Sequence, residues 1–178
     1  MRVADKSAHI TLRPLTKAEW VMVKDLRLHA LKTEPGVFVS SFDSEVIRSA
    51  RQWQETIHGA DHQVFGLFDR ERLIGLTAVF TSLDDPSGQT ALLAYSFINP
   101  RYRGLGLSRL LYKGRLNWIK SRPKFKRIVV SHRASNERSR RAILRHGFVL
   151  SGKSKRAWPD GTAEWELFYE MNIAEIQV

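Results

Sequence analysis

Residues 103–109, Arg-Gly-Leu-Gly-Leu-Ser-Arg, have the composition of an anion-binding turn. Gly104 and Gly106 allow the backbone to approach a ligand closely, and the free amides of a helix that starts here bind phosphate. The turn itself contains no Gly-Lys-Ser/Thr, so it is not a nucleoside-triphosphate P-loop, and it lacks the third glycine of a dinucleotide-binding turn. A phosphate-bearing ligand is therefore one interpretation. A tight turn that happens to contain two glycines is the other.

The elements around this turn are predicted from hydrophobic periodicity, and their order is typical of an α/β fold with a mixed sheet. The nearly continuous apolar run at 91–98 indicates a central strand covered on both faces, and a helical pattern follows at 107–118. Thr16 and Glu19 form a capping-box pattern for a helix that ends before Pro35. Further strands are predicted at 10–13, 64–68, 73–81, 127–131, 148–152 and 165–171, and further helices at 46–57 and 136–146.

Length and composition are those of one globular domain. The chain has 178 residues, 43% of them hydrophobic, and no linker or repeat, so we predict a single domain over residues 1–178. The lack of cysteine excludes disulfides and thiolate catalysis. No apolar run reaches the roughly 18 residues of a membrane span, and residues 1–10 lack the apolar core of a signal peptide. We expect a cytoplasmic protein without a membrane partner or a metal site.

Charge is distributed unevenly along the chain. Residues 101–156 hold 18 of the 29 Lys and Arg residues but only one acid, Glu137. This segment therefore has a net charge of +17, and the remainder has −6. Such a segment attracts a polyanion, which could be a nucleotide-bearing cofactor, a nucleic acid or an acidic membrane surface. Charge alone does not choose among them.

Two segments resemble motifs of one enzyme superfamily. Residues 99–111 resemble motif A of the GNAT superfamily of N-acetyltransferases, Arg/Gln-x-x-Gly-x-Gly/Ala, through Arg103, Gly106 and Ser108. Residues 136–148 are similar to motif B, in which Asn opens a helix that closes in Gly-Phe. The resemblance implies a GNAT-like fold: a central mixed, mostly antiparallel β-sheet flanked by helices, with a splayed central strand pair. It also implies an acceptor-side region at about 10–60 and an acetyl-CoA-binding core at about 90–150.

The resemblance further implies a set of acetyl-CoA contacts. Ser96, Phe97 and Ile98 would pair backbone groups with the pantetheine arm in the gap between the splayed strands. Asn136 would contact the pantetheine or the departing CoA. A primary amine, on a small molecule or a protein, would attack the thioester directly, which agrees with a chain that has no cysteine. The pyrophosphate would be held by the turn and the start of the helix, namely Arg103, Gly104, Leu105, Gly106, Leu107, Ser108 and Arg109.

The sequence departs from motif B at Ile143. The family commonly has a tyrosine there, whose phenol protonates the leaving thiolate, and isoleucine has no proton to donate. Ser139, His146 or a water molecule would then serve, or the thiolate would leave unaided. In motif A, Ser108 stands where Gly or Ala is usual, which is a mild change because serine is also small.

The general base is left open by the sequence. Glu164 and Glu166 are candidates because the last strand should border the acceptor cleft, and Asp84, Asp85 and His132 are alternatives. Each also has a structural explanation. Alternating glutamates are typical of a solvated strand face, acids before proline are typical of a turn, and a lone histidine is usually satisfied structurally.

Selectivity is expected to depend on the wall formed by residues 34–42, with Glu34, Phe38 and Phe42. Tyr95 on the central strand could add a hydroxyl, although a buried aromatic ring is its more common role.

A function of another class is also open. The missing motif B tyrosine and the +17 segment favour a non-catalytic acyl-CoA- or nucleic-acid-binding module that keeps the fold, whereas the phosphate turn favours the enzyme. The candidate partners are acetyl-CoA, the amine acceptor, an acidic or RNA-bearing assembly, and a second copy of the chain in a homodimer.

Overall fold

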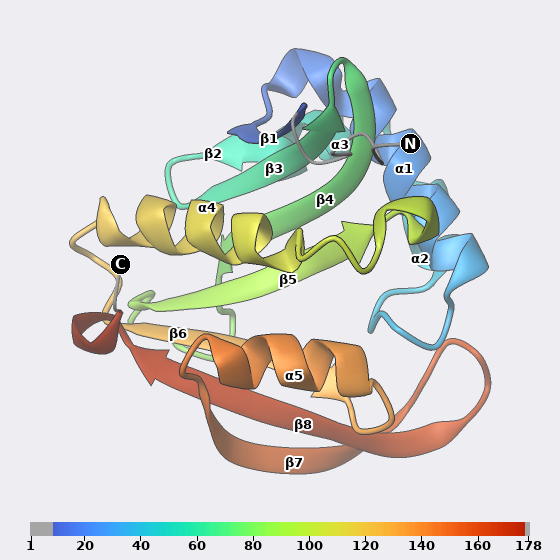
Figure 1. The fold of residues 1–178 in the computed structure, drawn as a ribbon. Helices are drawn as coiled ribbons and strands as arrows, with labels where there is room; N and C mark the ends of the chain where they lie inside the picture. The colour runs from blue at the N-terminus through green and yellow to red at the C-terminus, as the bar shows by residue number, and fades with distance from the viewer. Residues whose placement is uncertain (1–8, 177–178) are drawn as a thin grey trace, which may run out of the picture.

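The computed structural model describes residues 9–176, which form a twisted mixed sheet with helices on both faces (Figure 1). The strands are β1 (Ile10–Pro14), β2 (His58–Gly59), β3 (His62–Asp69), β4 (Arg72–Thr81), β5 (Thr90–Ile98), β6 (Arg127–Arg133), β7 (Val149–Ala157) and β8 (Ala163–Asn172). Their order is β1-β3-β4-β5-β6-β8-β7, and β2 pairs with β3. Every pair is antiparallel except β5 and β6. The predicted α/β fold with a mostly antiparallel sheet is confirmed.

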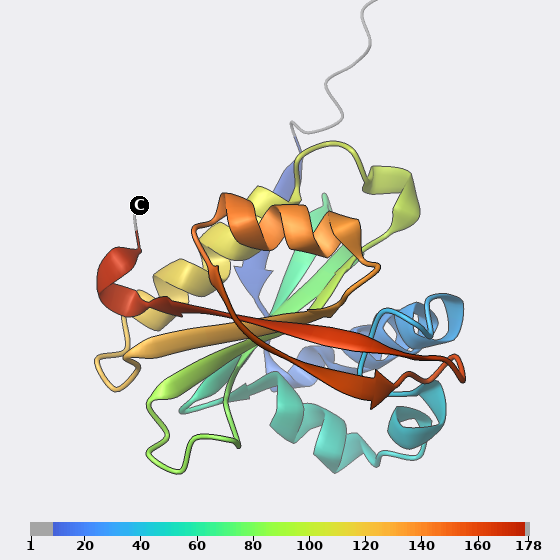
Figure 2. The same cartoon turned by 90° about the horizontal axis from the view of Figure 1, so that it is seen from below.

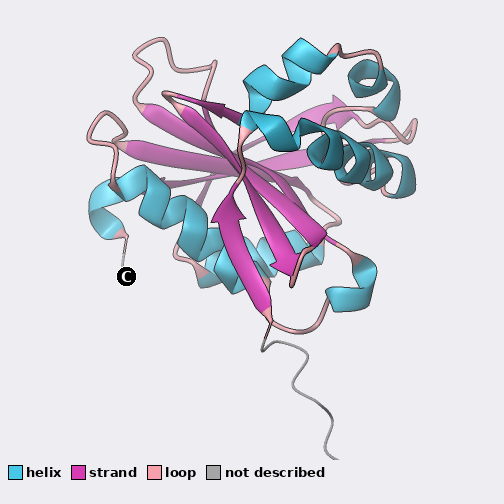
Figure 3. Cartoon of the chain, turned by 90° about the horizontal axis from the view of Figure 1, so that it is seen from above, coloured by secondary structure: helices cyan, strands magenta, loops and turns pink. Residues whose placement is uncertain are grey.

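The helices cover both faces of this sheet. They are α1 (Trp20–Thr33), α2 (Phe42–Val46), α3 (Ala50–Ile57), α4 (Ser108–Lys120) and α5 (Glu137–Arg145), with 3-10 turns η1 (Lys17–Glu19), η2 (Pro100–Tyr102) and η3 (Ile173–Glu175). Helices α4 and α5 lie on one face, whereas α1 and α3 lie on the other with α2 beside α1 (Figure 2 and Figure 3). Within residues 9–176 no helix combines the length and apolarity needed to cross a membrane. Residues 1–8, where we predict no signal peptide, lie outside the described part.

The capping box predicted at Thr16 and Glu19 is present. The backbone amide and the hydroxyl of Thr16 lie 2.9 and 3.0 Å from the Glu19 carboxylate. Arg13 of β1 donates to the same carboxylate at 2.7 Å. The Arg13 hydrogen bond is the largest of the contacts that lower the pKa of Glu19 to about 2. The start of the first helix is thereby tied to the edge strand.

The single helix predicted at 46–57 is wrong. Helix α2 ends at Val46, and Ile47 is 82% exposed. Ser49 then begins α3: its hydroxyl accepts from the Gln52 amide at 3.3 Å, and its amide donates to the Gln52 side chain at 2.8 Å. This second capping box satisfies the free amides of a new helix start. The local cap therefore outweighs the continuous apolar spacing.

The sheet opens between its two central strands. β5 and β6 pair only where residues 90–92 meet residues 127–129. Beyond Leu92 the described residues show no further pairing between them, and the two ribbons separate toward the end of β5 (Figure 1). The splayed central strand pair implied by the resemblance is confirmed.

Candidate active site at the diverging strands

A bulge in β5 lies where the strand leaves β6. The register with β4 shifts between Leu76 and Ala78, so that two residues, Tyr95 and Ser96, lie opposite one. Tyr95 has a φ of 59°, in the left-handed region that a bulky residue rarely adopts. The surrounding packing must hold this conformation, because it is unfavourable by itself.

The bulge reverses the alternation of side chains along β5. Leu93 packs in the apolar cluster beneath α4, whereas Tyr95 and Phe97 pack beneath α1. In a regular strand these three residues would share one face. Ser96 consequently turns toward α4, where its hydroxyl accepts a hydrogen bond from Arg115 at 2.9 Å.

The turn that follows β5 presents free backbone amides. Within the described residues, the amides of residues 104–108 have no hydrogen-bond acceptor. The Arg109 amide donates to the Gly106 carbonyl at 3.1 Å and is therefore not free. Arg109 could contact a ligand only through its side chain, which is exposed. Since α4 begins at Ser108, the free amides also stand at the positive end of the helix dipole.

The two glycines of the turn both have a left-handed backbone conformation. Gly104 and Gly106 have φ values of 83° and 72°, which favour glycine. A Cβ added at either position would meet no heavy atom within 4 Å. The space beside these two glycines is therefore open. Free backbone amides at a helix start are groups that bind anions.

The Arg103 side chain braces this turn against α1. Its Nε donates to the Ile98 carbonyl at 2.8 Å, and its guanidinium pairs with Glu34, next to the end of α1. The side chain is thus engaged within the protein, and a phosphate ligand would meet the backbone of the turn.

A groove of about 570 Å³ opens beside the turn. Its walls come from the end of α1, the turn before α4, the segment after β6 and the start of α5. Four guanidinium groups and two carboxylates line it, which gives it a net positive charge suited to phosphate groups. The lining residues are Glu34, Gly36, Val37, Arg103, Arg133, Ser135, Asn136, Glu137, Arg138 and Arg141.

Asn136 places the start of α5 at this groove. Its side-chain oxygen accepts from the Ser139 amide at 3.1 Å and caps the helix. Ser139 lies one turn before Ile143 and shares a helix face with it. The groove thus brings Asn136 together with Arg103, the first residue of the turn.

Comparison with known proteins agrees with this geometry. The family model of the acetyltransferase (GNAT) domain matches residues 9–149. The chain belongs to the GNAT acetyltransferase family. A search of curated proteins gives no match.

Solved structures share the GNAT fold. The GNAT-family acetyltransferase of Streptococcus pneumoniae has a TM-score of 0.80 at 14% identity, over 92% of this chain and 99% of that chain. The protein yncA of Salmonella typhimurium, solved with its cofactor acetyl-CoA, has a TM-score of 0.76 at 16% identity, over 96% and 98%. The ribosomal-protein-S5-alanine acetyltransferase of Vibrio fischeri has a TM-score of 0.76 at 15% identity, over 96% of each chain. At these identities the likeness shows the fold alone.

In this GNAT domain the motif B position is apolar and buried. Ile143 is 1% exposed and packs in one cluster with Tyr112. His146, the other group considered for the proton, stacks on Tyr112 with 4.0 Å between ring centroids. Its Nδ1 lies 2.7 Å from the Ala142 carbonyl, and burial lowers its pKa. Both residues therefore belong to the core between α4 and α5.

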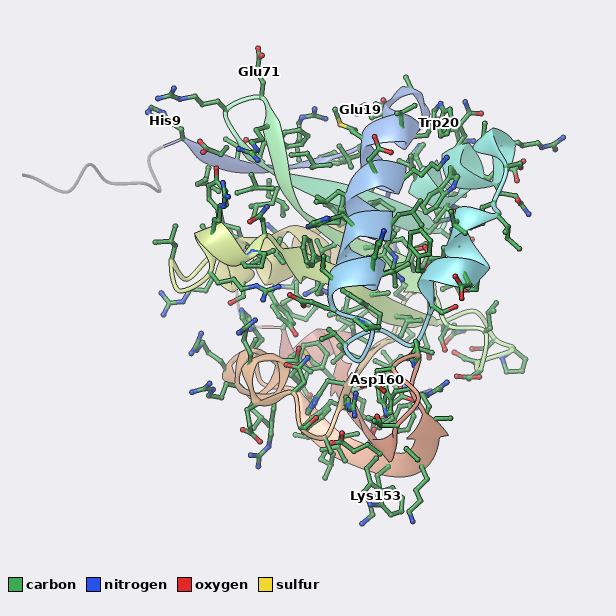
Figure 4. All side chains as sticks on the ribbon, turned by 90° about the vertical axis from the view of Figure 1, so that its right-hand side faces the viewer. His9, Glu19, Trp20, Glu71, Lys153 and Asp160 are labelled. Carbon is green, nitrogen blue, oxygen red and sulfur yellow. The ribbon has the colours of Figure 1, made fainter. Side chains whose placement is uncertain are left out.

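Glu164, a predicted base, is held by Arg133. The Arg133 guanidinium pairs with Glu164 and Asp160 and donates to the Gly36 carbonyl at 3.1 Å. The Ser135 amide also donates to Glu164, at 2.6 Å. The Arg133 hydrogen bond does most to lower the pKa of Glu164, which makes this carboxylate a weak base. Asp160 belongs to the turn between β7 and β8, and Figure 4 shows it on the side of that hairpin nearest the segment that follows α1.

Glu166, the other predicted base, is buried. It is 2% exposed and accepts from the Ser131 hydroxyl and from Arg156 Nε, each at 2.5 Å. The expectation of a solvated glutamate face is wrong for this residue. Arg156 on the neighbouring strand β7 supplies the opposite charge that a buried carboxylate needs.

Two of the three alternative bases, Asp85 and His132, have hydrogen-bond partners. Asp84 and Asp85 lie in the turn before β5, at the end of the strand opposite the gap. Hydrogen bonds from Ser87 and then Thr90 lower the pKa of Asp85 to about 2. His132 is 4% exposed, both of its ring nitrogens have hydrogen-bond partners, and burial lowers its pKa.

The wall predicted at 34–42 reaches the groove only in part. Glu34 lines the groove, whereas Phe38 and Phe42 pack beneath α1. Tyr95 lies under the Arg27 guanidinium, 4.0 Å from ring centroid to carbon, and burial raises the pKa of its phenol. Its ring is therefore a packing element.

The sequence patterns predict no role for Arg115 or Arg133. Arg115 follows Leu111 by four residues and so continues the apolar face of α4. A charge at such a position is a signal that could have singled it out. No comparable local signal exists for Arg133, because its partners lie about 30 residues or more away in the sequence.

Proposed function

We propose that this protein is an N-acetyltransferase that uses acetyl-CoA and acts on a primary amine. The observation that carries the proposal is the set of free amides at 104–108 beside a gap between β5 and β6. Membership of the GNAT family and the acetyl-CoA bound to yncA support it.

Three groups of residues would bind acetyl-CoA, the acyl donor. The amides of residues 104–108 bind the pyrophosphate, and Arg138 and Arg141 in the groove add charge for the phosphates. Ser96, Phe97 and Ile98 offer the unpaired edge of β5 to the pantetheine arm. Asn136 holds the groove open at the start of α5 and contacts the same arm.

The acceptor would enter from the side of Glu34 and Ser135. Its amine attacks the thioester carbonyl directly. Glu164 stays the candidate for contact with the amine because it touches Ser135 and Arg133, which both line the groove. Its lowered pKa suits it to binding the ammonium form, so we propose that the proton leaves through water. A role of Glu166 as general base stays a prediction. So does a role of the Ser139 hydroxyl near the leaving thiolate.

Calorimetric titration with acetyl-CoA at physiological salt tests donor binding, with ATP as a polyanion control. We expect acetyl-CoA to bind and ATP to bind far more weakly. Gly106→Val should abolish acetyl-CoA binding, because valine disfavours a φ of 72° and would fill the open space. Gly152→Val is the matched control, since a Cβ there also meets nothing within 4 Å and lies on exposed β7. Equal binding of both ligands, or wild-type affinity in Gly106→Val, would contradict the proposal.

Turnover can be measured by CoA release from acetyl-CoA in the presence of a panel of amines. The chain has no cysteine, so a thiol-reactive dye reports only the released CoA. The panel should pair small amines with peptides that carry a free α-amino group, because the relative from Vibrio fischeri is a ribosomal-protein acetyltransferase. Tight donor binding without release for any amine would favour the non-catalytic acyl-CoA-binding module.

A nucleic-acid-bearing partner is the second candidate, and the +17 segment favours it. Exposed Lys153 and Lys155 on β7 extend the basic surface of α5. Binding to RNA should then fall steeply as salt rises. Absence of retention on RNA at low salt would end this candidate.

A further inference from the structure

A buried guanidinium without an acid lies directly behind the gap. Arg115 is 0% exposed. Its Nε donates to the Leu111 carbonyl at 3.2 Å and its Nη1 to the Ser96 hydroxyl at 2.9 Å. Within the described residues Nη2 has no hydrogen-bond partner and no acid forms a salt bridge with this side chain. A buried positive charge left in this state favours a ligand that brings negative charge.

The groups around Arg115 do not supply that negative charge. The guanidinium carbon lies 4.3 Å from the ring centroid of Tyr112, which stacks on His146 of α5. Burial raises the pKa of Tyr112 and lowers that of His146, so both side chains are neutral near pH 7. From β4, Thr77 contributes only a hydroxyl. The other charged groups that act on His146 are both positive, Arg109 and Arg145.

Ser96 connects this charge to the gap. Its hydroxyl accepts from Arg115, so its own proton can be donated to Thr77, 3.3 Å away, or to a ligand. Ser96 is exposed, because it lies on the part of β5 that has separated from β6. A hydroxyl that accepts from a buried cation is polarised and becomes a stronger donor.

We infer that the Ser96 hydroxyl, polarised by Arg115, stabilises the departing thiolate of CoA. Ser96 thereby takes the role that Ile143, at the motif B position, cannot fill because it has no proton to donate. The inference rests on the proposed function. In this step the amine nitrogen bonds to the carbonyl carbon, the carbon–sulfur bond breaks and its electron pair goes to sulfur. Ser96 donates a hydrogen bond to that sulfur, and the proton lost by the amine goes to solvent. Ser96 is then a catalytic residue, and Arg115 is a positioning residue that acts through it.

The product complex gives a test that needs no acceptor. CoA and desulfo-CoA, which lacks the thiol, are titrated calorimetrically at pH 7.5 in two buffers of different ionisation enthalpy, so that the protons released on binding can be counted. The thiol of CoA is a simple aliphatic thiol, so in water it is almost fully protonated at this pH. A nearby cation lowers the pKa of a thiol and raises its ionised fraction. We therefore expect wild-type protein to release more protons on binding CoA than on binding desulfo-CoA.

Four variants separate the inference from a structural role. Ser96→Ala and Arg115→Met should each remove the extra proton release while desulfo-CoA still binds. Lys113→Met removes an exposed charge from the same helix and should behave as wild type. Ser139→Ala tests the competing hydroxyl and should also keep the proton release. If Arg115→Met does not fold, Ser96→Ala decides alone.

Two results would overturn the inference. One is equal proton release with CoA and desulfo-CoA in the wild type, and the other is loss of the extra release in Ser139→Ala but not in Ser96→Ala. Failure of both ligands to bind would instead refute the proposed function, so the two failures are distinguishable.

Discussion

Arg27 of α1 and Arg115 of α4 are both buried, on opposite faces of the same sheet. Arg27 pairs with Glu45 through Nη2 and Oε1 at 2.7 Å and lies over the ring of Tyr95. Arg115 lies over the ring of Tyr112, and its polar contacts are a hydroxyl and a carbonyl. In both sites a guanidinium lies over a tyrosine ring, but among the described residues only Arg27 has a carboxylate partner.

This difference separates a structural cation from one available to a ligand. Glu45 is 5% exposed, so the charge of Arg27 is neutralised within the protein, and the pair joins α1 to α2. Each arginine has one buried nitrogen without a hydrogen-bond partner among the described residues, so the difference between them is the acid. Arg115 instead contacts the one part of β5 that has left its neighbour. The positive charge of Arg115, which no acid of the described residues pairs with, thus lies near the gap in which, in the proposed reaction, the CoA thiolate forms.

The largest expected effect comes from replacing each arginine by methionine. Arg27→Met leaves Glu45 buried without its partner and should lower the free energy of unfolding by about 3–5 kcal/mol. Arg115→Met leaves no buried acid without its partner, so it should lower the free energy of unfolding far less than Arg27→Met does. Urea denaturation of both variants measures the contrast. Equal destabilisation would show that Arg115 is as structural as Arg27.

A smaller effect is expected from restoring the family's tyrosine. Ile143→Tyr places a larger side chain in a site that is 1% exposed, against Tyr112. Overpacking should lower the free energy of unfolding by about 1–3 kcal/mol. Ile143→Val, which only removes a methylene, should lower it by about 0.5–1.5 kcal/mol. Wild-type stability for Ile143→Tyr in the same denaturation assay would mean that the α4–α5 side still has room for the phenol.

The smallest effect is expected at Arg133. This arginine is partly exposed and pairs with both Asp160 and Glu164. Hydrogen bonds from Thr162 and then Arg133 lower the pKa of Asp160 to about 2. A carboxyl whose pKa is lowered in the folded state stabilises that state above its unfolded pKa, about 3.9. The contribution is lost as pH falls through about 2. Wild type should therefore melt above Asp160→Asn at pH 5 to 7, and the two melting temperatures should converge toward pH 2. A difference that stays constant with pH would contradict this assignment.

Sequence reasoning succeeded where a few neighbouring residues suffice. The two glycines of the turn, the capping box at Thr16 and the neighbouring strands β3 and β4, predicted at 64–68 and 73–81, depend on residues only a few positions apart. It failed where two local signals competed, as at Ser49, whose cap breaks the helix predicted at 46–57. It also misjudged Glu166, because the compensating Arg156 belongs to another strand.

The sequence by itself determined the turn with its two glycines, the order of the main strands and helices, and the apolar residue at the motif B position, because each is a matter of residue type and short spacing. Only the tertiary structure decided which way Ser96 faces and what stands behind it. The bulge at Tyr95 arises from the pairing of β5 with β4, and it reverses the alternation on which sequence patterns depend. The burial of Arg115 likewise follows from how α4 packs on the sheet, a contact between residues 19 positions apart.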